Sequence, residues 1–108
     1  METLNLNLIP GQPSKICHVS ENDVGRVIRL KLVDGFIPYT LTGSESLKLR
    51  IRKPGKPIFT EAVTNTSDDY VDIVTSENMT DTPGRVYCKL RIGTIGAAAF
   101  YLDVEKKP

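Results

Sequence analysis

Alternation of apolar and polar side chains is the feature that most limits what this chain can fold into. It is clearest in RVIRLKL at residues 26–32, SLKLRIR at residues 46–52 and RVYCKLRI at residues 85–92. Successive side chains of a β-strand point to opposite faces, so each stretch predicts a strand with one buried and one solvated face. Weaker strands are expected at residues 4–8, 16–19, 37–41, 58–63, 70–75 and 100–104.

The number and spacing of these segments indicate the fold class. No window has the apolar spacing of an amphipathic helix, and SENMTD at residues 76–81 suffices for one short helical turn. Short strands separated by turns every 8–12 residues or so are typical of β-sandwiches. We therefore expect an all-β fold: an immunoglobulin-like antiparallel β-sandwich of about eight strands with Greek-key connections. At 108 residues the chain fits one domain, residues 1–108.

Glycine and proline pairs separate the predicted strands. Asp34-Gly35 is a dipeptide favoured in β-hairpins, and IGTIGA at residues 92–97 predicts a second hairpin. Pro54-Gly55 and Pro83-Gly84 suit the centre of a type II turn, because proline presets φ and glycine accepts a positive φ.

The segment ENDVG, residues 21–25, predicts a further turn before the first clear strand. We expect Asp23 to bond nearby backbone amides and to pair with Arg26, while Gly25 permits a sharp strand entry. The segment is interpreted either as a well-made turn or as a docking motif. The predicted structural turn residues are Asp23, Gly25, Arg26, Asp34, Gly35, Pro83 and Gly84.

The distribution of charge limits the partners. Lys and Arg number 14 against 13 Asp and Glu, whereas a nucleic-acid-binding domain usually carries a large basic excess. Six acids and no Lys or Arg lie between residues 57 and 83. The outward positions of the three clearest strands carry seven cations and no acid: Arg29, Lys31, Lys48, Arg50, Arg52, Lys89 and Arg91.

If these three strands share a sheet, their cations form a basic stripe. The stripe is interpreted as a solvated face that also blocks edge-to-edge pairing, or as a docking site for an acidic protein. No aromatic side chain is expected to interleave with these cations, which removes the stacking platform that single-strand nucleic-acid binders use. Nucleic acid is therefore not expected as a partner.

The first residues, 1–13, are a possible N-terminal arm. In LNLNLIP the side chains of Leu4, Leu6 and Leu8 alternate with polar ones before a proline. Such an arm either adds a strand to the sheet of a neighbouring molecule or forms the first edge strand of the same domain.

Export and membrane signals are not visible in the sequence. METLNLNLIPG has no cationic start and no continuous apolar run, and the longest apolar run, residues 97–102, falls far short of the ~20 residues a membrane helix needs. We therefore expect Cys17 and Cys88 to be reduced and buried, with a disulfide between them as the alternative.

Groups that carry chemistry are sparse. The only histidine, His18, lies near Cys17, Ser14 and Ser20, yet nothing there resembles an activated nucleophile, even with Asp23 to orient the imidazole. Two cysteines and one histidine do not supply a zinc site. Asp68, Asp69 and Asp72 lack the glycine and ligand spacing of a calcium loop and are interpreted as a solvated turn. We expect no enzyme activity, no cofactor and no bound metal, and a small-molecule ligand is not expected.

Several stretches together carry a resemblance to a known family: ICHVSENDVGRVIRLKLVDG, YTLTG, LRIRKPGKPIF, PGRVYCKLRI and AAFYLDVEK. They resemble the N-terminal domain of baseplate upper proteins of tailed phages, a domain also found at the start of other phage fibre proteins. The family's opening segment matches His18, Ser20, Asp23, Val24, Gly25 and Arg26. Later segments match Tyr39, Thr40, Thr42, Gly43, Gly84 and Tyr87.

The resemblance implies a structural role without active-site residues. Members of this kind look like anchors that dock on the virion, on the baseplate, distal tail or capsid, and carry host-recognition modules. It implies a homo-oligomer, trimeric in the particle, assembled in the bacterial cytoplasm. The polar ending DVEKKP looks like a point where a longer protein continues. The alternatives are the base of a head fibre and a carbohydrate-binding or adhesive sandwich, which requires a cluster of exposed aromatic residues.

Overall fold

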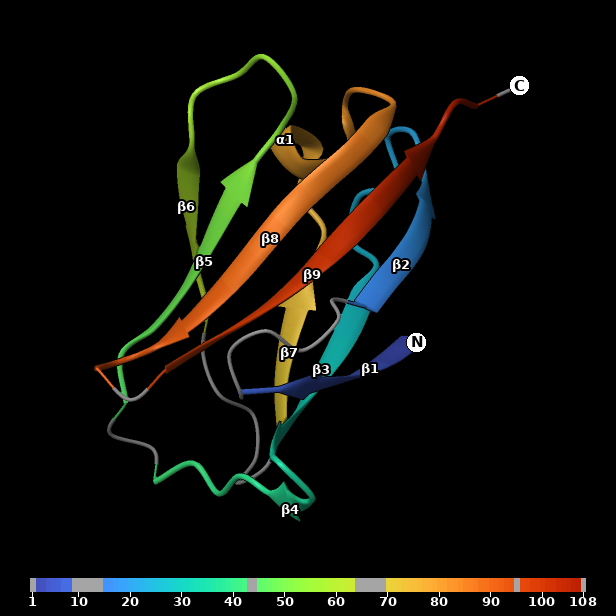
Figure 1. Cartoon of the computed structure of the whole chain (residues 1–108). Helices are drawn as coiled ribbons and strands as arrows, with labels where there is room; N and C mark the ends of the chain where they lie inside the picture. The colour runs from blue at the N-terminus through green and yellow to red at the C-terminus, as the bar shows by residue number, and fades with distance from the viewer. Residues whose placement is uncertain (1, 9–14, 43–44, 64–69, 95, 108) are drawn as a thin grey trace.

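Two β-sheets stack face to face in the computed structural model, which describes residues 2–8, 15–42, 45–63, 70–94 and 96–107 (Figure 1). The first sheet, sheet A, has four strands and the second, sheet B, has five. A single hydrophobic core fills the space between the sheets and includes residues of both. The predicted all-β sandwich is confirmed.

Sheet A is arranged around one long strand, β3 (Val27–Asp34). β1 (Glu2–Asn7) pairs with β3 in parallel, while β7 (Tyr70–Val74) and the two-residue β4 (Ile37–Pro38) pair with it antiparallel.

Sheet B has the strand order β2–β9–β8–β5–β6. Its longest members, β8 and β9, form a hairpin at its centre, and β2 pairs with β9 in parallel. The bounds are β2 (Lys15–Ser20), β5 (Leu47–Arg52), β6 (Phe59–Ala62), β8 (Gly84–Ile92) and β9 (Gly96–Glu105). One short helical turn, α1 (Glu77–Thr80), precedes β8, as SENMTD predicted.

Alternation determines which side chains enter the core. On β3 the inward residues Ile28, Leu30 and Leu32 are buried, and on β5 Leu49 and Ile51 are buried, whereas the intervening residues are partly or fully exposed. Full burial of an aliphatic side chain of this size contributes about 1.5–3 kcal/mol. The sandwich is therefore held together chiefly by these inward rows.

The sheets are mixed, which differs from the all-antiparallel pairing that the sequence predicted. The chain passes from β1 in sheet A to β2 in sheet B and back to β3 in sheet A. Strands separated by such a crossover can run in the same direction, and β1 and β3 do so. Alternation determines which face of a strand is apolar but leaves the direction of its neighbour open.

The predicted turns have different outcomes. Pro54-Gly55 forms the expected type II turn, with Gly55 at φ +69° and the Lys56 amide donating to the Lys53 carbonyl at 3.2 Å. The β8–β9 hairpin is also confirmed. The prediction of a turn at Pro83-Gly84 is wrong, because Gly84 is already the first residue of β8 and is paired with Val104.

The hairpin at Asp34-Gly35 is present one residue later than expected. Asp34 pairs with Ile37 as the last rung of β3 and β4, so the loop consists of Gly35 and Phe36. Gly35 has φ +71°, which suits the first central position of a type II′ turn. The predicted strand at residues 37–41 shortens to Ile37–Pro38.

Candidate protein-interaction surface

The seven cations of the predicted basic stripe do not lie on one sheet. Arg29 and Lys31 belong to β3 in sheet A, whereas the other five belong to β5 and β8 in sheet B. The condition for one continuous stripe, that the three strands share a sheet, is therefore not met. Similar alternation in three strands indicated similar polarity, but it carried no information on which strands are neighbours.

Arg29 has a structural role on sheet A. Its guanidinium donates to both carboxylate oxygens of Asp72 on the paired strand β7, at 2.9 and 3.0 Å, and lies 3.8 Å from the centre of the Tyr70 ring. The hydrogen bonds from Arg29 hold the pKa of the Asp72 carboxyl below its usual value. This side chain is already engaged within the domain.

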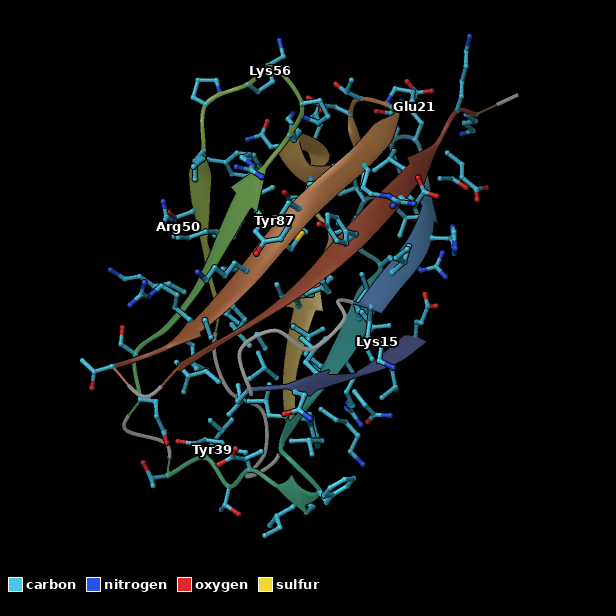
Figure 2. The ribbon with its side chains drawn as sticks, viewed as in Figure 1. Lys15, Glu21, Tyr39, Arg50, Lys56 and Tyr87 are labelled. Carbon is cyan, nitrogen blue, oxygen red and sulfur yellow. The ribbon has the colours of Figure 1, made fainter. Side chains whose placement is uncertain are left out.

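The outer face of sheet B collects the remaining cations. Lys48 lies opposite Arg91, Arg50 opposite Lys89, and Arg52 opposite Tyr87, in the three outward-facing rungs that alternate with buried apolar pairs between β5 and β8. The face is turned toward the viewer in Figure 2, where Tyr87 is seen over β8 and Arg50 beside β5. We call this surface the basic face; it consists of Lys48, Arg50, Arg52, Arg85, Lys89, Arg91, Tyr87 and Tyr101.

Two tyrosines lie among these cations, contrary to expectation. Tyr87 and Tyr101 are cross-strand neighbours on β8 and β9, with ring centres 5.4 Å apart in an edge-to-face arrangement. The guanidinium of Arg52 lies 5.4 Å from the centre of the Tyr87 ring, and that of Arg85 lies 5.6 Å from the Tyr101 ring. The alternation of RVYCKLRI already places Tyr87 on the side of Lys89, so this signal was present in the sequence.

Two hollows flank the Tyr87 ring. One, of about 180 Å³, is lined by Arg50, Ile51, Arg52, Ile58, Tyr87 and Lys89. The other, of about 420 Å³, extends over the Pro54-Gly55 turn and shares Arg52 and Tyr87 with the first. Both are open to solvent, and cations make up part of the lining of each.

The leucines of the predicted docking arm are part of the domain. β1 is the first edge strand of sheet A, and Leu4 and Leu6 are 8% and 2% exposed because they face the core; Leu8 packs against the core. Residues 2–7 thus form the first edge strand of the same domain, one of the two interpretations of the arm, and Leu4 and Leu6 are not surface docking residues. The rest of the arm, residues 9–13, lies outside the described residues.

The ENDVG segment forms a turn locked by a residue that the sequence did not point to. Gly25 has φ +86°, and its amide donates to the carbonyl of Thr75 at 2.8 Å. The Thr75 hydroxyl donates to the Asp23 carbonyl at 2.7 Å and accepts from the Arg26 amide at 2.9 Å. The expected Arg26–Asp23 ion pair is present at 3.2 Å. These contacts favour the interpretation as a turn.

His18, the residue considered for catalysis, lies on β2 at the edge of sheet B. His18 is 61% exposed, and its Nδ1 lies 3.4 Å from carboxylate oxygens of Asp103 and Glu105 rather than near Asp23. Cys17 and Cys88 are free and buried, as expected. The described residues contain no group of three His, Cys, Asp or Glu suited to a metal ion. Ser14, Gly43, Asp68 and Asp69 lie outside the described part of the chain.

Within the described ranges, no helix is long and apolar enough to cross a membrane.

The fold of the chain resembles that of a solved structure. The chain matches the N-terminal domain of phage TP901-1 ORF48 with a TM-score of 0.74, over 98% of this chain and 100% of that one. The two share a fold. Their sequence identity is 18%, so the likeness concerns architecture. No protein-family model matches the chain, and no curated protein sequence matches it.

The structural neighbour is an N-terminal phage domain, as the sequence resemblance predicted. The more specific assignment to baseplate upper proteins stays a prediction.

Proposed function

We propose that this chain is a structural protein of a phage virion, the anchoring domain of a tail baseplate or fibre protein. The observation that carries the proposal is the fold match to an N-terminal phage domain along essentially the whole of both chains. The family-like segments found in the sequence, from ENDVGR to the closing hairpin, support the same assignment independently.

The architecture suits a role in assembly. The long β8–β9 hairpin runs the length of sheet B, and its outer face presents charged and aromatic side chains (Figures 1 and 2). In this proposal the domain docks on another virion protein in several copies, and modules that recognise the host are carried by the same assembly.

The test is to find the protein in particles. Virions of the encoding phage are purified on a density gradient, and the chain is quantified in them by mass spectrometry, with a host cytosolic protein as the control for contamination. We expect a fixed number of copies per particle. A chain that is found only as a free monomer, absent from particles, contradicts the proposal.

Antibody labelling of the same particles separates tail from head. Label at the tail tip supports the baseplate assignment, whereas label on the capsid supports the alternative, the base of a head fibre.

A further inference from the structure

Two alternate rungs of sheet B, separated by the Leu49–Leu90 pair, place like charges directly opposite each other. Lys48 on β5 is paired with Arg91 on β8, and Arg50 on β5 is paired with Lys89 on β8. Like charges at opposed positions of neighbouring strands destabilise a sheet. Among the residues that the structure describes, none of these four cations forms an ion pair. This part of the basic face therefore works against the stability of its own sheet.

Elsewhere the same chain pairs its cations with acids. Arg29 on β3 lies opposite Asp72 on β7 and binds it through two hydrogen bonds. Lys53, nearly buried, donates to the Asp81 carboxylate at 2.7 Å. Departures from such local rules are expected where a surface has a function beyond folding.

The rows beside these rungs supply side chains that typically anchor protein interfaces. Tyr87 and Arg52 border a shared hollow, and tyrosine and arginine are enriched among residues that dominate binding energy. On β9, Ala97 and Ala99 lie opposite Arg91 and Lys89. Because alanine side chains are small, a partner can approach the backbone of β9 closely beside the cations.

We infer that the basic face docks on an acidic surface of a different virion protein, one that presents several carboxylates in a flat cluster. The inference rests on the proposed virion role. Cations two residues apart on β5 are separated by about 7 Å and those on adjacent strands by about 5 Å, so the cluster needs carboxylates at similar spacings. The arginine guanidinium groups match such carboxylates in a bidentate geometry.

A protein fits this face better than nucleic acid does. A guanidinium already lies over each tyrosine ring, so the rings are not presented as an open platform for bases. The net charge of the chain is only +1, without the basic excess of a nucleic-acid binder. Two of the acids that a second copy of this chain would offer, Asp72 and Asp81, are already bound to cations of their own domain.

The test uses the double variant Lys89→Glu/Arg91→Glu, which places one acid opposite each of Arg50 and Lys48. Because both like-charge rungs become opposite-charge rungs, the variant is expected to fold and to melt at or above the temperature of the wild type. The control is Lys31→Glu/Lys106→Glu, the same change of charge at two exposed positions away from the basic face. Each protein is produced in host cells that are infected with a phage lacking the gene. The amount of the protein per purified particle is then measured.

We expect the amount of the Lys89→Glu/Arg91→Glu variant per particle to be lower than that of the wild type by a factor of about ten or more, because attraction is replaced by repulsion at two positions. The control is expected to enter like the wild type. An acid-to-base change in another particle protein that restores entry supports the inference and identifies the partner.

Three results overturn the inference while leaving the proposed function intact. The first is normal entry of the Lys89→Glu/Arg91→Glu variant into particles. The second is release of the wild-type chain from particles by nuclease, which indicates nucleic acid as the partner. The third is self-association of the purified wild type that the variant loses, which indicates a second copy. Absence of the wild type from particles, by contrast, contradicts the proposed function itself.

Discussion

Cys17 and Cys88 show how burial controls the chemistry of single residues. Both thiols are fully buried on the inner side of sheet B, on β2 and β8, with β9 between these strands. Two strand spacings separate their backbones by about 10 Å, beyond the reach of a disulfide without movement of the chain. Burial raises the pKa of the Cys88 thiol to about 12. Burial, together with the hydrogen bond to the Glu2 carboxylate at 2.8 Å, raises the pKa of Cys17 to about 12.

These raised pKa values predict that the protein loses stability in alkaline solution. In the unfolded chain the thiols ionise near their ordinary pKa of about 9, whereas in the folded chain they keep their protons. The folded state then holds more protons, so the free energy of unfolding falls as the pH rises from about 9 toward 12. We expect a slope of at most about 1.4 kcal/mol per pH unit for each thiol, measured by urea unfolding at a series of pH values.

The matched control is Cys17→Ala/Cys88→Ala. It is expected to be less stable than the wild type at neutral pH, because it leaves small cavities, but to show a shallower alkaline decline. An equal slope in both proteins would mean that the decline comes from other groups.

At the scale of elements, Thr75 joins the ENDVG turn to the end of β7. Its hydroxyl and its backbone bond Asp23, Gly25 and Arg26, so one residue satisfies polar groups on both sides of the entry to β3. Thr75 itself is 2% exposed, which keeps water from replacing these bonds. The entry to the central strand of sheet A therefore depends on a single buried hydroxyl.

Replacement of Thr75 by the isosteric valine is expected to lower the free energy of unfolding by about 2 kcal/mol, since two partly buried main-chain groups lose their hydrogen-bond partner. Thr75→Ser is the control, because it keeps the hydroxyl and loses only a methyl group, at a cost of about 1 kcal/mol. Urea unfolding of the three proteins measures both values. Equal stability of the valine and serine variants would show that the hydroxyl bonds contribute little.

The sequence predicted what is local in these elements and missed what depends on partners. The alternation in β5 and β8 correctly gave the strands and their buried faces, and Pro54-Gly55 correctly gave a turn. The alternation gave no information on which sheet a strand belongs to. The predicted stripe therefore combined Arg29 with cations that lie in the other sheet. Thr75 was missed for the same reason, because its role arises only when β7 reaches the ENDVG turn.

One part of the basic face could be predicted from the sequence, and the other part depends on how the strands pair. Its cations follow from the outward positions of β5 and β8, but their opposition as like-charge rungs follows from the register between the strands. The pairing of Tyr87 with Tyr101 likewise depends on the register of the β8–β9 hairpin.

At the scale of the whole molecule, near-neutrality conceals a separation of charge. The basic face carries six cations, whereas the net charge of the chain is only +1. A molecule with so little net charge has little overall repulsion between its charges. The repulsion that remains acts between neighbouring like charges. The like-charge rungs of sheet B are where we expect that repulsion to be measurable.

Salt therefore distinguishes charge from other causes in the Lys89→Glu/Arg91→Glu variant. At low ionic strength the variant is expected to be more stable than the wild type by about 1 kcal/mol, since each cross-strand pair contributes roughly 0.2–1 kcal/mol. At about 1 M salt the screening length falls to about 3 Å, so this difference should nearly vanish. Thermal unfolding of both proteins across a salt series measures the difference, and Lys31→Glu/Lys106→Glu should stay close to the wild type throughout. If the difference persisted at high salt, the two substitutions would be acting through strand propensity or packing, and the basic face would not be under electrostatic strain.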